Sequence, residues 1–215
     1  MDWVGWHEDY RDPDSALSLR LREVQRQLAA FLDQNPDRPV RVVSACAGDG
    51  RDVIEVLAER PDRDRVSGRL VELDPTLATR AGDAAAEHGL TGVEVVEGDA
   101  GIVDAYRGAV PADLVLFCGV FGNIADADIE RTIATLPQLC APGATVIWTR
   151  GRRTPDLLEP IRRWFDQAGF TRRELITPEG VSWSVGVERL TAGPVPFVPG
   201  ERLFTFVDRS RSTSP

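Results

Sequence analysis

The residues best suited to hold a nucleotide-type ligand lie in two short segments, about twenty residues apart. The first, Arg41–Asp52, is an apolar run that turns at Gly48 and Gly50, and the second, Leu70–Pro75, carries Glu72. Two glycines separated by one residue let the backbone approach a ligand and expose N–H groups at a helix start. A carboxylate at the tip of the next strand can accept hydrogen bonds from both ribose hydroxyls. Together the segments predict a site for a ribose-containing cofactor.

These segments resemble the class I S-adenosylmethionine-dependent methyltransferases, and the resemblance covers most of the chain after about residue 38. The family's glycine motif, Asp-x-Gly-x-Gly-x-Gly, falls on Ser44, Cys46, Gly48 and Gly50, so its last two positions match and its first two differ. Four further landmarks follow in the family's order: Val71–Pro75, Glu97–Ala100, Ala112–Gly119 and Leu139–Ile147. The resemblance implies an α/β fold, a Rossmann-like doubly wound seven-stranded sheet with an N-terminal helical lid, and S-adenosylmethionine as cofactor.

The positions that match the family imply a cofactor site around the glycine turn and the strand ends beside it. Glu72 is implied to accept hydrogen bonds from the ribose, and Asp99 from the adenine amino group. Arg51, directly after the turn, is a candidate partner for the donor's carboxylate. The implied cofactor-binding residues are Ala45, Cys46, Ala47, Gly48, Arg51, Glu72, Leu73, Gly98, Asp99, Ala100, Cys118 and Gly119.

The family builds its acceptor pocket over the strand ends, from the N-terminal segment and the loops after the fourth and fifth strands. The implied substrate-binding residues are Trp3, Trp6, Phe121, Asn123, Trp148 and Arg150. The aromatic character of residues 3–10 is unusual for a chain end and predicts a docked lid. The alternative is that Trp3 and Trp6 only staple the leading helix to the body.

Two residues of the same N-terminal segment are candidates for catalysis. His7 has an ordinary pKa close to neutrality, which suits a general base, and Tyr10 is the second candidate. An alternative role for Tyr10 is a contact with the donor's methionine carboxylate, as the resemblance implies.

A nicotinamide-binding Rossmann domain is the nearest alternative on the same fold. Its fingerprint needs a third glycine three residues after the second, where this chain has Val53. Lysine is absent, and all 25 basic residues are arginine, which excludes a P-loop lysine and a Schiff-base lysine. We therefore expect a methyltransferase that acts on a small molecule by in-line transfer. A protein that binds the same cofactor without methylating, as a sensor, a scaffold or a cyclising enzyme, is the alternative.

Composition narrows the partners and the location. With 215 residues, 42% of them hydrophobic, and no apolar run long enough for a bilayer, the chain predicts one soluble domain without a membrane partner. The first residues lack a secretory signal, so we expect a cytoplasmic protein, monomeric or homodimeric. A net charge of −9 disfavours nucleic acid, and three scattered cysteines with two histidines predict no metal.

The elements that must position these residues follow from periodicity. A leading helix is expected from Asp12, its N-cap, with an apolar stripe that ends before Pro36. Strands are then expected at Val40–Ala45, Val66–Leu73, Val93–Val96, Leu114–Cys118 and Thr145–Thr149, with helices at Arg51–Arg60, Pro75–His88, Ala127–Leu139 and Pro155–Ala168. An antiparallel pair, Thr171–Ile176 and Trp183–Leu190, follows, and Leu203–Val207 is a candidate last strand. The expected division is a lid segment with the leading helix (1–37), a cofactor-binding domain (38–208) and a disordered tail (209–215).

Overall fold

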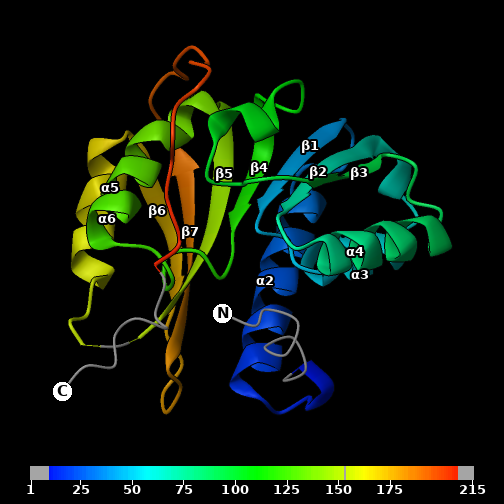
Figure 1. Cartoon of the computed structure of the whole chain (residues 1–215), viewed down its shortest axis with the longest axis horizontal. Coiled ribbons are helices and arrows are strands. Elements are labelled where there is room, and N and C mark those ends of the chain that lie inside the picture. The colour runs from blue at the N-terminus through cyan, green and yellow to red at the C-terminus, as the bar shows by residue number, and fades with distance from the viewer. Residues whose placement is uncertain (1–9, 153, 208–215) are drawn as a thin grey trace.

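A seven-stranded sheet forms the centre of the protein in the computed structural model, which describes residues 10–152 and 154–207 (Figure 1). The strand order is β3-β2-β1-β4-β5-β7-β6. The first five strands pair in parallel, and β7 runs antiparallel to both β5 and β6. The expected doubly wound, seven-stranded α/β fold is confirmed. The strands are β1 (Val40–Ala45), β2 (Val66–Glu72), β3 (Val93–Glu97), β4 (Ala112–Phe117), β5 (Cys140–Gly151), β6 (Phe170–Ile176) and β7 (Trp183–Leu190).

Helices cover both faces of the sheet, which explains why most residues of the central strands are buried. One face is covered by α2 (Ala16–Asp33), α3 (Arg51–Ala58) and α4 (Pro75–Glu87). The other face packs against α5 (Asp126–Thr135), α6 (Leu158–Gln167) and the short 3-10 helix Val103–Tyr106. The strand order reverses between β1 and β4, so a crevice is expected at their carboxyl ends.

Several expected boundaries differ from the structure, most clearly the start of α2 and the length of the fifth strand. The N-cap of α2 is Ser15, whose hydroxyl accepts from the Ser18 N–H at 3.1 Å, whereas Asp12 accepts from Asp14 N–H in the preceding turn. The fifth strand is much longer than the apolar run Thr145–Thr149. Its extra residues pair with neighbouring strands on both sides, a tertiary effect that the run does not encode.

Residues 201–207 do not form a strand; they cross the loops after β3 and β4 as a segment that we call the C-terminal strap. Two isolated antiparallel bridges, Ile102 with Arg202 and Ile124 with Phe206, hold it at either end. Between them the Leu203 N–H donates to the Gly101 carbonyl at 2.8 Å. In Figure 1 the strap is the red segment that passes in front of the sheet.

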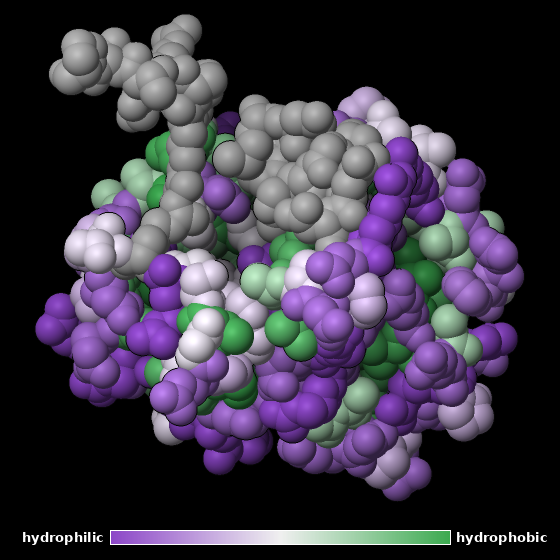
Figure 2. Space-filling view, turned by 90° about the horizontal axis from the view of Figure 1, so that it is seen from below, coloured by the Kyte–Doolittle hydropathy of each residue, from purple (hydrophilic) through white to green (hydrophobic). Residues whose placement is uncertain are grey.

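The molecular surface is mainly polar. On the face seen in Figure 2, polar side chains predominate and the apolar ones form small, separate groups. Among the described residues, no helix has the length and apolar character that crossing a bilayer would need.

A cluster of aromatic rings fills the core between β5 and the α5–α6 layer. The Trp148 indole is fully buried and stacks on Phe165, with 6.1 Å between ring centroids. Its other face lies on Gly186 of β7, the residue that pairs with it in register. A Cβ atom built on Gly186 would lie 2.2 Å from Trp148 Cε2, so only glycine fits there.

Gly186→Ala is therefore expected to lower the free energy of unfolding by about 1–3 kcal/mol, the usual cost of overpacking a core. Urea unfolding of the purified protein measures this. Gly82→Ala is the matched control, because Gly82 lies in α4 and a Cβ atom added to it would meet nothing within 4 Å. The control should be neutral or slightly stabilising, since alanine favours a helix over glycine. Equal stability of the Gly186 variant and the parent would contradict the close contact.

Candidate functional site

The glycine turn between β1 and α3 takes a left-handed backbone at alternate residues. Cys46 has φ +54°, Gly48 +60° and Gly50 +73°. Among the described residues, Cys46 is the only non-glycine with positive φ, and it stands where the family pattern has its first glycine. Gly50 caps α3, and a Cβ there would lie 2.7 Å from Ile54 Cδ1. The turn thus keeps the tight geometry of the motif despite its altered first half.

Glu72, at the end of β2, fixes this turn. Its Oε2 accepts from the Gly48 N–H at 2.8 Å, and its Oε1 accepts from the Asp74 N–H at 2.8 Å. The residue is only 8% exposed, and the carboxylate lines the cavity described next. An ionised carboxylate has about four acceptor sites, so two hydrogen bonds leave capacity for two hydroxyl donors.

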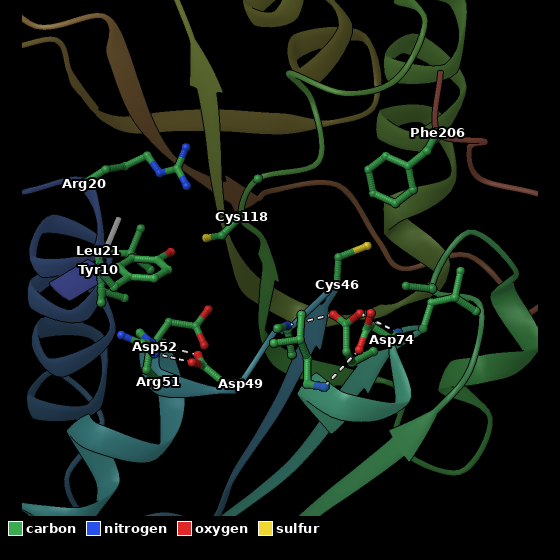
Figure 3. A pocket seen from close by; sticks show the side chains of 18 of the residues that line it. Tyr10, Arg20, Leu21, Cys46, Asp49, Arg51, Asp52, Asp74, Cys118 and Phe206 are labelled. Atoms are coloured by element: carbon green, nitrogen blue, oxygen red, sulfur yellow. Dashed lines mark hydrogen bonds and ion pairs between the residues drawn. The ribbon is translucent and has the colours of Figure 1, made fainter. Parts of the chain in front are cut away.

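A cavity of about 330 Å³ opens at the carboxyl ends of the parallel strands (Figure 3). The structure brings most of the sequence-predicted residues to its wall: Tyr10, Cys46, Ala47, Gly48, Arg51, Glu72, Leu73, Asp99, Ala100, Cys118 and Gly119. Two of the predicted cofactor-binding residues do not line the cavity. Ala45 is a buried residue of β1, and the Gly98 N–H donates to the Glu72 carbonyl at 2.8 Å, which continues the β2–β3 pairing.

One end of the cavity is rich in charged groups. Arg51 donates through its guanidinium to both carboxylate oxygens of Asp49 and lies over the Tyr10 ring, 4.3 Å from its centroid. Arg20, from α2, projects into the cavity toward Cys118 (Figure 3). Arg51 is therefore already engaged with Asp49, and Arg20 is a second candidate to meet an anionic ligand group.

Burial raises the pKa of Tyr10 to about 12. A phenol with such a pKa stays protonated at neutral pH, so Tyr10 is poorly suited to be a general base. The raised pKa disfavours Tyr10 as a general base, and a protonated phenol can instead donate a hydrogen bond. His7, the other candidate, lies outside the described residues, as do Trp3, Trp6 and residues 209–215.

Asp52, in the first turn of α3, is a buried carboxyl group in the same charged end. It is 8% exposed, and its Oδ1 accepts from the Val53 N–H at 2.9 Å. Burial raises the pKa of Asp52, the hydrogen bond from the Val53 N–H lowers it, and the charges of Asp49 and Glu55 raise it further. The net result is a pKa of about 7, compared with the ordinary value of 3.8. The fold therefore holds near neutrality a carboxyl group that would otherwise be fully ionised.

The opposite end of the cavity combines apolar surface with acceptors. Leu73, 62% exposed, lines it together with Asp99, Ala100 and Phe206. Asp99 Oδ1 accepts from the Gly101 N–H at 2.8 Å, and its Oδ2 accepts from Arg202 at 3.1 Å. The two ends of the cavity thus differ in character. One carries arginine and aspartate side chains, and the other is mainly apolar, with the Asp99 carboxylate as an acceptor.

The predicted acceptor residues on the loops after β4 and β5 do not lie at this cavity, which corrects that part of the sequence analysis. Phe121 and Trp148 are fully buried and pack on each other, with 5.8 Å between centroids. Arg150 is 8% exposed and donates to the Phe121 carbonyl. Asn123 donates to the Gly119 carbonyl at 2.7 Å. Phe121 and Trp148 belong to the core cluster that packs against α5 and α6, and Arg150 and Asn123 donate to backbone carbonyls of the loop after β4.

Nine cavity residues lie outside the set predicted from the sequence, and they include Arg20, Asp52 and Phe206. A signal existed for Arg20, which lies four residues before Val24 and so shares the apolar face of its helix. Phe206 was assigned only to a candidate last strand, and nothing local in the sequence indicates that it reaches the cavity. Among the described residues, no three His, Cys, Asp or Glu side chains gather as a metal site.

The strand order, the glycine turn and the Glu72 carboxylate together define a class I, Rossmann-like methyltransferase. A family model described as "Putative methyltransferase" matches residues 3–170, and the chain belongs to this family of S-adenosylmethionine-dependent methyltransferases. No curated protein matches the sequence.

Solved structures share the fold at low sequence identity. Magnesium protoporphyrin IX methyltransferase from Synechocystis, with bound S-adenosylmethionine, has a TM-score of 0.67 at 13% identity, over 87% of this chain and 90% of its own. An O-methyltransferase family protein from Burkholderia thailandensis has a TM-score of 0.64 at 18% identity, over 82% of this chain and 57% of its own. An RNA methyltransferase from Salinibacter ruber, in complex with S-adenosylhomocysteine, has a TM-score of 0.51 at 19% identity, over 81% of this chain and 97% of its own. At these identities the likeness establishes the fold.

Proposed function

We propose that the cavity binds S-adenosylmethionine with its adenosine at the apolar end and its amino-acid group at the charged end, for methyl transfer to a small molecule. The observation that carries this proposal is the Glu72 carboxylate, which anchors the glycine turn and lines the cavity. The donor has the same two-ended character as the cavity, a nucleoside at one end and a zwitterion at the other.

The residues divide the work of donor recognition. Glu72 accepts from the ribose hydroxyls, Leu73 and Ala100 contact the adenine, and Asp99 accepts from its amino group. At the other end Arg20 pairs with the donor's carboxylate and Asp52 with its ammonium group. The backbone of Cys46–Gly48 and of Cys118–Gly119 forms the wall between them, and Gly98 and Ala45 support that wall from behind.

Methyl transfer from a sulfonium is an in-line displacement, so the protein must mainly align the two reactants and exclude water. The bound donor supplies the activated methyl group. The leading helix α2 contributes Arg20, Leu21 and Val24 to the cavity wall, which supports a lid function for the segment up to residue 37. Residues from position 38 onward then form the main donor-binding domain, to which α2 adds Arg20.

A small-molecule acceptor fits the charge of the chain. The net charge of −9 repels a polyanion at long range, and every described cavity residue belongs to a recessed site at the strand ends. The test supplies a methyl-labelled donor together with a metabolite extract below 3 kDa, total RNA or total protein, in separate reactions. Label is expected in the metabolite fraction, with S-adenosylhomocysteine as coproduct. Label in RNA or protein would overturn the acceptor class, and methylthioadenosine as product would indicate cyclisation.

Asp99 provides a graded test of the donor's orientation. Asp99→Ala is expected to weaken S-adenosylhomocysteine binding about tenfold or more, the scale of one lost hydrogen bond to a charged group. Asp99→Asn should weaken it less, because an amide oxygen can still accept from the adenine amino group. Calorimetric titration measures both. Asp104→Asn is the control, since Asp104 accepts from the Gly200 N–H outside the cavity. Parental affinity in both Asp99 variants would place the adenine elsewhere.

A further inference from the structure

The C-terminal strap is fixed to the loops that border the apolar end of the cavity. Its Leu203 and Phe204 are fully buried or nearly so, and Phe204 packs edge-on against Phe117 of β4 at 6.2 Å. The Thr132 hydroxyl donates to the Leu203 carbonyl at 3.0 Å, and the Val207 N–H donates to the Asn123 carbonyl at 3.0 Å. The strap is therefore part of the folded core and holds its side chains in defined positions.

Two contacts join the strap to the loop that carries Asp99. Arg202 donates to Asp99 Oδ2 at 3.1 Å, and the strap backbone presses on Gly101 so closely that no side chain fits there. A Cβ atom built on Gly101 would lie 2.4 Å from the Phe204 carbonyl oxygen and 2.9 Å from Asp99 Oδ1. The position of Asp99 thus depends on the strap.

Phe206 carries the strap into the cavity itself. Its ring meets the Phe204 ring edge-on at 5.5 Å, which fixes its tilt, and it lines the cavity along with Asp99 and Ala100. In Figure 3 the ring lies at the far end of the cavity from Tyr10 and Arg20, above Cys46. An aromatic face at this end suits the planar base of a nucleoside and not a zwitterion.

We propose that Phe206 is a donor-binding residue whose ring packs against the adenosine, and that the strap positions Asp99 for the same group. This inference rests on the proposed function. Its consequence is that residues 201–207, which lie beyond the part of the chain matched by the family model, complete the donor site.

The test compares two ligands that share adenosine and differ in the amino-acid group, S-adenosylhomocysteine and 5′-methylthioadenosine. Phe206→Ala is expected to weaken both by the same factor, about 10- to 100-fold, the usual effect of losing a base–aromatic contact. Phe206→Tyr, which keeps the ring, should bind both within about threefold of the parent. Val207→Ala is the matched control, because Val207 is the exposed next residue of the strap and does not line the cavity.

A second variant reaches the same site without altering a cavity side chain. Gly101→Ala should push the strap away from Asp99 and weaken both ligands, and thermal unfolding of each variant checks that the fold persists. Parental affinity of Phe206→Ala for both ligands, or a loss confined to S-adenosylhomocysteine, would overturn the inference and leave the proposed function intact. A parent protein that binds neither ligand would instead overturn the proposed function and this inference with it.

Discussion

Glu72→Ala is expected to lower the affinity for S-adenosylhomocysteine at least about 100-fold, or roughly 2.7 kcal/mol. Two losses add up in this variant. The ribose loses its charged acceptor, worth about 1.5–3 kcal/mol, and the N–H groups of Gly48 and Asp74 lose the carboxylate that holds the turn in shape. Calorimetric titration of the variant and the parent measures the change, and urea unfolding measures the accompanying loss of stability.

Glu97→Ala is the matched control for this prediction. Glu97 ends the neighbouring strand β3 and pairs in register with Glu72, but it is exposed and does not line the cavity. Glu97→Ala removes the same charge as Glu72→Ala, at the same level of the sheet, so both variants change the long-range electrostatics to a similar degree. Its affinity should equal that of the parent. If Glu72→Ala also bound like the parent, the ribose would have to lie away from the glycine turn.

Asp52→Asn is expected to stabilise the ligand-free protein at pH 8 by up to roughly 4 kcal/mol while it weakens donor binding. The pKa of Asp52 is raised to about 7 in the fold, so between about pH 4 and pH 7 the folded state holds a proton that the unfolded state has released. The free energy of unfolding therefore falls as pH rises from about 4 to about 7, and stays low above this range. An amide in place of the carboxyl group removes that cost.

The stability gain should shrink to below about 1 kcal/mol at pH 4, where the unfolded aspartate is largely protonated too. Urea unfolding at pH 8 and pH 4 tests this sign. Glu59→Gln is the control, because Glu59 is the exposed C-cap of the same helix and its charge is not among the causes of the raised pKa of Asp52. A variant less stable than the parent at pH 8 would show that the fold stabilises the ionised form.

The ligands separate the role of Asp52 in binding from its effect on stability. S-adenosylhomocysteine, which has an ammonium group, should bind Asp52→Asn about tenfold or more weakly at pH 8, whereas 5′-methylthioadenosine should bind as to the parent. For the parent, the affinity for S-adenosylhomocysteine should rise as pH increases through about 7, since Asp52 then becomes ionised. Equal losses for both ligands would place the ammonium group away from Asp52.

The sheet could be predicted from the sequence because its strands are short apolar runs bounded by turn residues. The limits of β1 and β7 were predicted to the residue, and those of β2 and β3 within one. The fifth strand was underestimated because Pro142 and Gly143 have low strand propensity, whereas Cys140 before them pairs with β4, and Arg150 and Gly151 after the apolar run pair with β7. The length of this strand depends on the neighbouring strands with which it pairs, and a linear sequence pattern does not contain that information.

The residues of the cofactor wall could be predicted from the sequence for a related reason, whereas those of the acceptor wall could not. Gly48, Glu72 and Asp99 each lie where a strand ends, so local sequence places them at the same edge of the sheet. Phe121 follows β4 and Trp148 lies within β5, but an aromatic side chain serves equally as core or as pocket wall. β5 is buried on both sides around Trp148, so no alternation of polar and apolar residues reveals which way the ring points.

The cavity wall includes Tyr10 and Phe206, so both ends of the described chain contribute to it. A ligand seated there contacts the first and the last segments of the fold together, and neither segment can detach while the ligand is held. Donor binding is therefore expected to raise the free energy needed to open either end by RT ln(1 + c/Kd), where c is the donor concentration, a gain that grows with c. The protein couples its resistance to local opening, and hence to proteolysis, to the supply of its donor.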